Sequence, residues 1–307
     1  MPALARSLLD TSSLSETEIL NLFSHSDLLA ARGKNFYNHG PQRVVCLLFF
    51  EPSTRTRMSF QTAAYRLGHH VSTMELFGGS SLAKGETFGD TVLNILAMQP
   101  DVLVIRYGKS SELDELLPTL SIPVISGGCG TRAHPTQALL DAYTISRELK
   151  SIKGQRVLIV GDVRHSRVAR SNFDVLTKLG AEIAVCGPQE LLPSPGEVPG
   201  LKIFGDLDEA VGWASVYMGL RIQLERHNMD DIRTDALGEY HRQFGLTASR
   251  LEKLSKDAII MHPGPINHGV EFSAEVLKDP RSRVMQQVTN GVLIRAALLS
   301  KVLGEKA

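Results

Sequence analysis

The chain has 307 residues, which exceeds the usual single-domain length and favours two domains of roughly 150 residues each. Its 43% hydrophobic and 21% charged residues are typical of a globular protein with a sizeable core. Lysine plus arginine and aspartate plus glutamate both number 33, so general binding to nucleic acid or to an acidic membrane surface gains no support. Any basic site must therefore be local.

The three cysteines, Cys46, Cys129 and Cys186, are widely spaced and form no CxxC pair, which argues against a disulfide framework or a cysteine zinc site. The histidines show no spacing typical of metal ligands, so we expect no metal. No segment approaches the roughly 18 apolar residues of a membrane span, and residues 1–10 are too weakly apolar for a signal peptide. We therefore expect a cytoplasmic protein with reduced thiols.

Apolar patterns predict strands and helices that alternate along the chain. A capping box at Ser15 and Glu18 predicts a first helix over about 15–32. The predicted strands cover 44–50, 71–76, 102–105, 123–126, 156–162, 182–186, 215–220 and 258–261. Further helices are predicted after residue 53, around 92–96, and over 134–149, 167–179 and 283–303.

This alternation predicts the α/β class, with two domains that each contain a central parallel sheet flanked by helices. We place one domain at 1–148 and the other at 149–283, linked by the long helix that ends near residue 149. The last helix, within 284–307, is expected to return and pack on the first domain.

Ser53, Thr54, Arg55 and Thr56 follow the strand 44–50 and begin a helix. Free N–H groups and the positive end of the helix dipole favour an anion at such a point. The hydroxyl groups and the guanidinium add further donors there. An ordinary capped helix with surface arginines is an equally good interpretation of this segment alone. Arg57 is expected to form a structural salt bridge.

Polar residues also follow several other predicted strands. In an open parallel sheet, ligands bind beyond the carboxyl ends of the strands. Such residues are Arg106, His134, Arg167, Arg221 and the segment His262-Pro263-Gly264-Pro265. Four arginines in these positions, counted with Arg55, predict a cleft for an anionic ligand. His262 is expected only to brace the turn that presents Pro265.

Two motifs, Ser53-Thr54-Arg55-Thr56-Arg57 and His134-Pro135-Thr136-Gln137, resemble those of the carbamoyltransferases, and the resemblance spans nearly the whole chain. Within that family, His262-Pro263-Gly264-Pro265 and Arg221-Ile222-Gln223 resemble the catalytic chain of the aspartate-specific members. The resemblance implies transfer of a carbamoyl group from carbamoyl phosphate to L-aspartate, a committed step of pyrimidine synthesis. It also implies two α/β domains and no cofactor.

The resemblance assigns roles residue by residue. It implies that Ser53, Thr54, Arg55, Thr56 and Arg106 hold the phosphate. Thr56, Arg106 and His134 would face the carbonyl oxygen, a role that suits preorganised donors. Gln137 and the Pro265 carbonyl, presented by Gly264, would hold the carbamoyl NH2. The two carboxylates of aspartate would be held by Arg167, Arg221 and Gln223. The catalytic set would be Arg55, Thr56, Arg106, His134 and Lys84.

In the family, the glycine- and serine-rich segment that contains Lys84 reaches into the active site of a neighbouring subunit of a trimer. The resemblance therefore implies a homotrimer with shared active sites, in which Ser80 or Ser81 supplies the serine. Regulatory chains or another pyrimidine-pathway enzyme are further possible partners. Two alternatives remain: a carbamoyltransferase for another amine acceptor, and an inactive relative that only binds anions. A dinucleotide site after residue 160 is disfavoured because G-x-G-x-x-G is absent there.

Overall fold

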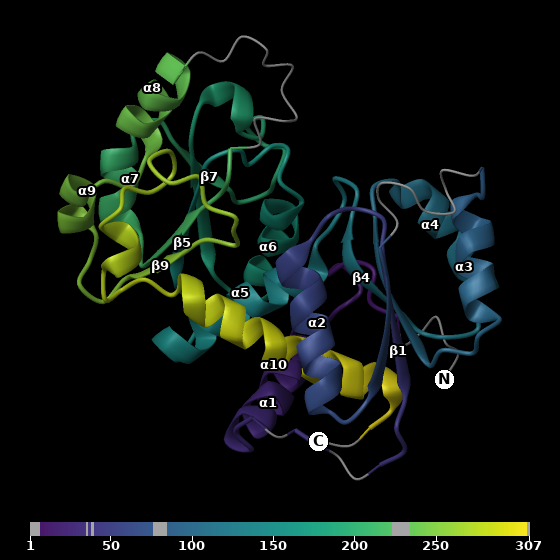
Figure 1. Cartoon of the computed structure of the whole chain (residues 1–307). Coiled ribbons are helices and arrows are strands. Elements are labelled where there is room, and N and C mark those ends of the chain that lie inside the picture. Colours follow the sequence, from purple (N-terminus) through teal and green to yellow (C-terminus); the bar gives the residue numbers. More distant parts are fainter. Residues whose placement is uncertain (1–6, 35, 38–39, 76–84, 223–233, 306–307) are drawn as a thin grey trace. The chain divides into compact units, whose positions relative to one another are not determined.

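The computed structural model describes residues 7–34, 36–37, 40–75, 85–222 and 234–305 (Figure 1). The chain divides into two compact units, one made of Met1–Leu140 with Val288–Ala307 and the other of Asp141–Gln287. The predicted boundaries after residues 148 and 283 differ from these divisions by several residues. The function assigned to each domain stays a prediction.

The first unit is built on a parallel four-stranded sheet of order β2-β1-β3-β4. Its strands are β1 (Val44–Phe49), β2 (His70–Glu75), β3 (Val102–Tyr107) and β4 (Val124–Cys129). All of β4, and all of β1 after its first residue, are buried. Helices cover both faces of such a sheet, so its inner strands read as continuous apolar runs. The edge strand β2 is largely exposed, and its sequence is correspondingly polar.

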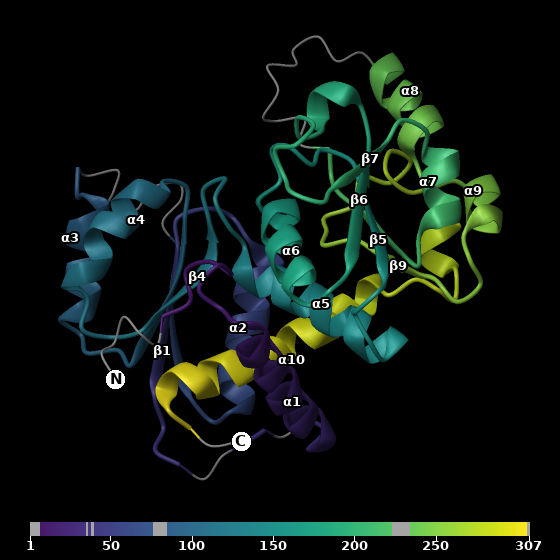
Figure 2. The same cartoon turned by 180° about the vertical axis from the view of Figure 1, so that it is seen from behind.

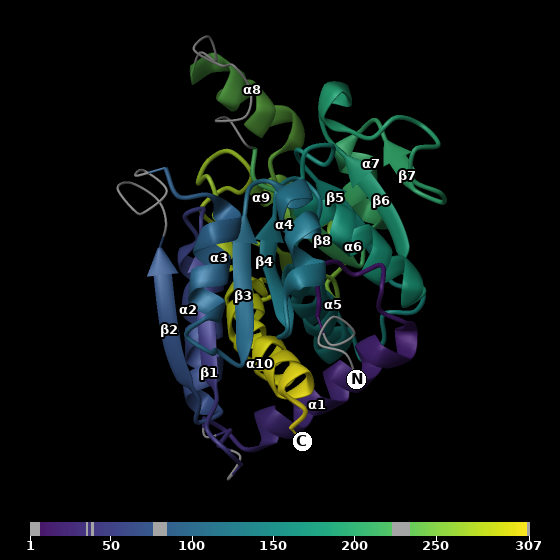
Figure 3. The same ribbon diagram turned by 90° about the vertical axis from the view of Figure 1, so that its right-hand side faces the viewer.

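Figure 1 shows α2 (Thr54–Arg66) on one side of this sheet, with α3 (Phe88–Leu96) and α4 (Ser110–Leu116) on the other. Phe88, Val92 and Leu113 pack with Leu48 and Leu103 of the sheet. The unit also contains α1 (Glu16–Ala31), the short η3 (Leu117–Thr119), and parts of α5 (Pro135–Leu149) and α10 (Val284–Leu303). Figure 3 shows this sheet with α3 and α4 in front of it.

The second unit is built on a parallel five-stranded sheet of order β7-β6-β5-β8-β9. Its strands are β5 (Arg156–Val160), β6 (Glu182–Cys186), β7 (Lys202–Phe204), β8 (Val216–Gly219) and β9 (Ile259–Met261). Figure 2 shows α6 on one face and α7 and α9 on the other. The remaining elements are α6 (Arg167–Lys178), α7 (Leu207–Trp213), α8 (Thr234–Phe244), α9 (Ala248–Lys253), η4 (Gln189–Leu191) and η6 (Val276–Lys278).

The predicted fold, two α/β domains with parallel sheets, is confirmed. The capping box at Ser15 and Glu18 is also confirmed, because each side chain accepts a hydrogen bond from the other residue's backbone N–H. The elements β7, α4, α7, α8 and α9 were not predicted; all of them except α8 have at most seven residues. Among the described residues, no helix is long and apolar enough to cross a membrane.

Candidate active site

The predicted anion-binding segment lies where β1 passes into α2. Ser53 is the N-cap residue of α2, and among the described residues its hydroxyl makes no capping hydrogen bond to the helix. Thr54 and Arg55 are exposed, whereas Thr56 is buried. The first N–H groups of a helix lack partners within the helix, so this start can donate to the oxygens of an anion. Arg57 pairs instead with Glu75 of β2, which confirms its predicted structural role.

Arg106 lies next to this segment because it pairs in register with Phe49, the last residue of β1. Its Nη1 donates to the Gly127 carbonyl oxygen at 3.1 Å, and its Nε lies 3.5 Å from Glu51 Oε2. A Cβ at Gly127 would lie 3.4 Å from the Arg106 Cβ, so glycine leaves room for the arginine. The side chain is 13% exposed, and its guanidinium is therefore a held cation at the carboxyl ends of the strands.

His134 and Gln137 lie at the start of α5, just after β4. The His134 carbonyl accepts hydrogen bonds from the backbone N–H groups of Gln137 and Ala138 at 3.0 and 3.2 Å. Both predicted side chains are buried. The first turn is further anchored by Thr136, whose hydroxyl accepts a 3.2 Å hydrogen bond from Arg295 of α10. These contacts place the imidazole and the amide at the beginning of a helix fixed within the first unit.

The sheet order explains how these segments meet. β1, β3 and β4 are successive neighbours and run parallel, so the loops that follow them lie along one edge of the sheet. Residues 53–56 follow β1 and His134 follows β4, while Arg106 is the next-to-last residue of β3. The predicted Ser80 and Lys84 lie outside the described residues.

The second unit repeats this arrangement. β5, β8 and β9 are successive parallel neighbours, and each is followed by predicted site residues. Arg167 begins α6 and is 9% exposed, after Ser166, whose hydroxyl accepts the Ala169 N–H at 3.1 Å. Arg221 follows β8 and is half-buried, and the segment 262–265 follows β9. Gln223 lies outside the described residues.

Gly161 allows the segment before Arg221 to approach the end of β5. Its φ is +130°, and an added Cβ would lie 2.7 Å from the Leu220 carbonyl oxygen. The Leu220 N–H also donates to the Val160 carbonyl at 2.7 Å. A side chain at residue 161 would therefore displace the strand end that carries Arg221.

Gly161→Ala is expected to destabilise the protein by about 1–3 kcal/mol, because alanine is strained at this φ and its Cβ meets backbone. Urea unfolding followed by circular dichroism would measure the change. The control is Gly212→Ala in α7, where an added Cβ meets nothing within 4 Å. Alanine is the better helix former, so that variant should be as stable as the parent or more so. Equal midpoints for both variants would contradict the close approach at Gly161.

The His262 side chain braces the turn after β9, which confirms its predicted role. The Gly264 N–H donates to His262 Nδ1 at 2.9 Å, and the φ of Gly264 is +67°, a conformation that glycine adopts without strain. The His262 N–H itself donates to Gln287 Oε1 at 2.8 Å. These contacts fix the backbone that presents Pro265.

Glu271 also belongs to this site, although its sequence context did not predict it. Its carboxylate accepts hydrogen bonds from the backbone of both Ile222 and Asn267. A buried glutamate shortly after the His262-Pro263-Gly264-Pro265 segment carried no periodic signal, and only its contacts with residues distant in the chain mark it. No group of three metal-ligating side chains occurs in the described parts of the chain.

Comparisons with known proteins agree with this geometry. Residues 6–147 match the family described as aspartate/ornithine carbamoyltransferase, carbamoyl-P binding domain, and residues 153–302 match the corresponding Asp/Orn binding domain. The chain belongs to the aspartate/ornithine carbamoyltransferase family. The family resemblance read from the sequence is therefore confirmed, and its two domain models correspond to the two parallel sheets described above.

Members of this carbamoyltransferase family resemble the chain to different degrees. The aspartate carbamoyltransferase catalytic subunit of Desulfitobacterium hafniense is 45% identical over 273 residues, which cover 89% of this chain and 84% of that protein. The structure of Trypanosoma cruzi aspartate transcarbamoylase with aspartate and phosphate has a TM-score of 0.84 at 29% identity, with 99% and 96% coverage. Ornithine carbamoyltransferase from Pyrococcus furiosus has a TM-score of 0.85 at 26% identity, with full coverage of both chains. Fold similarity alone therefore does not distinguish an enzyme that uses aspartate from one that uses ornithine.

Proposed function

We propose that the protein is an aspartate carbamoyltransferase, which transfers the carbamoyl group of carbamoyl phosphate to L-aspartate and forms N-carbamoyl-L-aspartate and phosphate. This is an early committed step of pyrimidine biosynthesis. The observation that carries the proposal is the placement of matching residues at the ends of three adjacent strands in each unit. The 45% identity to a catalytic subunit of that name supports aspartate as the acceptor.

The proposed reaction joins the aspartate amine to the carbonyl carbon while the bond from that carbon to the phosphate oxygen breaks. The amine gives up one proton, which the departing phosphate takes up, and negative charge develops on the carbonyl oxygen during the attack. Donors held in place before the reaction stabilise such charge. In this proposal Thr56, Arg106 and His134 serve as these donors, and their low exposure supports it because electrostatic interactions are stronger away from bulk water. Phosphate is a good leaving group, so no covalent nucleophile is required.

Other residues bind and orient the substrates in this proposal. Ser53, Thr54 and Arg55, with the α2 N-terminus, hold the phosphate, and Lys84 and Ser80 add to that site. Gln137 and the Pro265 carbonyl hold the carbamoyl NH2. Arg167, Arg221 and Gln223 bind the two carboxylates of aspartate, since forked guanidinium groups match carboxylates better than lysine does.

We further propose a homotrimer in which the segment with Ser80 and Lys84 completes the active site of a neighbouring subunit. Regulatory chains or another pyrimidine-pathway enzyme are candidate partners of that trimer. The proposed location is the cytoplasm, which the burial of all three cysteines as thiols supports. Light scattering of the purified protein tests the trimer, because a monomeric mass at assay concentration would contradict shared active sites.

The proposed activity is tested by carbamoyl transfer from carbamoyl phosphate to L-aspartate, run beside L-ornithine. Product with aspartate alone is expected. Product with ornithine alone would keep the phosphate site and overturn the acceptor. If neither acceptor reacts while carbamoyl phosphate still binds, the protein is an inactive relative, or the trimer requires a further partner.

A further inference from the structure

We propose that Glu271 is a positioning residue, whose carboxylate sets the distance between the backbone that carries Arg221 and the backbone that carries Pro265. The inference rests on the proposed roles of those two residues in binding aspartate and the carbamoyl NH2. Glu271 itself is 2% exposed. It therefore acts on the substrates through its neighbours.

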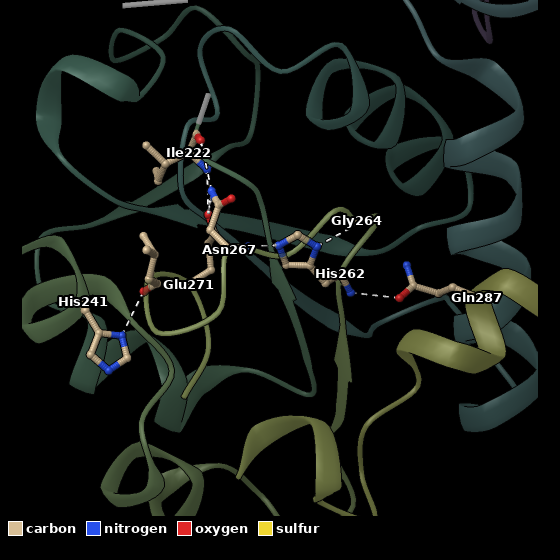
Figure 4. A network of polar contacts seen from close by, with 8 residues as sticks. Ile222, His241, His262, Gly264, Asn267, Glu271 and Gln287 are labelled. Atoms are coloured by element: carbon tan, nitrogen blue, oxygen red, sulfur yellow. Dashed lines mark hydrogen bonds and ion pairs between the residues drawn. The ribbon is translucent and has the colours of Figure 1, made fainter. Parts of the chain in front are cut away.

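The carboxylate joins two segments that are far apart in the chain (Figure 4). Glu271 Oε1 accepts hydrogen bonds from the Ile222 N–H at 3.0 Å and from Asn267 Nδ2 at 2.9 Å. Glu271 Oε2 accepts the Asn267 N–H at 2.6 Å. Ile222 directly follows Arg221, and Asn267 lies two residues after Pro265. One side chain thus holds the backbone beside both proposed substrate contacts.

The backbone of Glu271 is fixed by hydrogen bonds and by the packing of the next residue. Its backbone carbonyl accepts the Leu246 N–H at 2.9 Å, and the Ser273 N–H donates to the Leu246 carbonyl at 3.1 Å. Phe272 between them is 1% exposed and lies against the Tyr217 and His262 rings, with centroids 6.1 and 5.2 Å apart. A fixed backbone presents the carboxylate in one place, which is what positioning of a partner requires.

His262 connects this carboxylate to the turn that bears Pro265. Because the Gly264 N–H donates to Nδ1, that nitrogen is unprotonated and the ring carries its hydrogen on Nε2. His262 Nε2 lies 4.0 Å from Glu271 Oε2. Burial raises the pKa of Glu271, while hydrogen bonds from Ile222 and Asn267 oppose that shift.

The network continues from His262 into the helices of the same unit. The Gln287 side chain, which accepts the His262 N–H, donates from Nε2 to Asp141 Oδ1 at 2.8 Å. Asp141 Oδ2 accepts from Asn172 Nδ2 at 3.0 Å. Asp141, Asn172 and Gln287 are each at most 2% exposed. These hydrogen bonds connect the turn after β9 to α5, α6 and α10. They oppose movement of the turn relative to those helices.

Burying a carboxylate costs desolvation free energy, and apolar side chains in its place often stabilise a protein core equally well. What apolar packing does not supply is directional acceptors for N–H groups from two separate segments. We therefore expect removal of Glu271 to change aspartate use more than it changes folding.

The test compares Glu271→Ala and Glu271→Gln with the parent and with Glu275→Ala, an exposed control on the same segment. Steady-state kinetics give KM for aspartate and kcat, and calorimetry with inorganic phosphate probes the anion site alone. Hydrogen exchange of a peptide that ends at residue 222 reports the Ile222 N–H directly. Glu271→Gln preserves the shape and one acceptor, and it keeps the test usable if the alanine variant does not fold.

We expect Glu271→Ala to lower kcat/KM for aspartate about 100-fold, mainly through KM, because small misplacements of binding groups have effects of that size. Glu271→Gln should lie between the parent and alanine, and both should speed exchange at Ile222. The Glu271 variants should bind inorganic phosphate with the affinity of the parent. The Glu275→Ala control should match the parent in KM, kcat and exchange at Ile222.

Three outcomes would overturn the inference. If the parent transfers carbamoyl to aspartate and the folded Glu271 variants do so equally well, the positioning role is wrong and the proposed function stands. The same holds if the variants only melt earlier while KM and kcat are unchanged. If the parent itself fails with aspartate but binds phosphate, the proposed function falls and the inference falls with it.

Discussion

Arg106→Ala is expected to lower kcat by about 10²–10³-fold, the usual effect of removing one donor to a developing oxyanion. The Arg106 side chain is 13% exposed and its guanidinium donates to the Gly127 carbonyl, so the group has little freedom to lose when substrate binds. It is also assigned to the phosphate, so weaker binding of carbamoyl phosphate should accompany the loss. Initial rates with saturating aspartate and varied carbamoyl phosphate separate the two effects.

Arg106→Lys tests whether the forked geometry matters, because lysine keeps the charge without the planar donors. We expect it to recover only a small part of the rate. Lys109→Ala is the charge-matched control three residues away, since Lys109 is exposed and its Nζ lies 2.8 Å from Oε1 of nearby Glu112. A surface pair of this kind contributes less than ~1 kcal/mol. Equal activity of Arg106→Ala and Lys109→Ala would remove Arg106 from the catalytic set.

The strands of both sheets could be predicted because burial leaves a strong local pattern. β6 matches its predicted limits, 182–186, and β5 lies within the predicted segment 156–162, since helices cover both faces and every inner residue is apolar. Once the strands were predicted from this pattern, Arg106, Arg167 and Arg221 could be predicted to lie at or after the carboxyl ends of strands. β7 has only three residues at a sheet edge, and two of them are exposed, so its sequence carried little signal.

The positioning network could not be predicted because its contacts join residues far apart in sequence. Ile222 and Glu271 are 49 positions apart, and Gln287 reaches Asp141 across 146 positions. No spacing rule connects such pairs, and a buried glutamate in a loop resembles an exposed one until the fold is known. The predicted site residues therefore came from strand ends and motifs, while the residues that hold them in place came from the structure.

The proposed aspartate-binding and phosphate-binding residues can be tested separately. Arg221 belongs to the second unit. The residues proposed to bind phosphate, 53–56 and Arg106, belong to the first. A change at Arg221 should therefore affect aspartate without affecting phosphate.

Arg221→Ala is expected to raise KM for aspartate roughly 10- to 100-fold, the range for losing hydrogen bonds to a charged group worth about 1.5–3 kcal/mol. Binding of inorganic phosphate, measured by calorimetry, should stay within twofold of the parent. Arg156→Ala, which removes an exposed arginine at the start of β5, is the matched control and should leave KM unchanged. If Arg221→Ala weakens phosphate as much as aspartate, the residue acts on the fold of the site. If it changes neither, the aspartate carboxylates are bound elsewhere, and the acceptor assignment loses the residue that most specifically supports it.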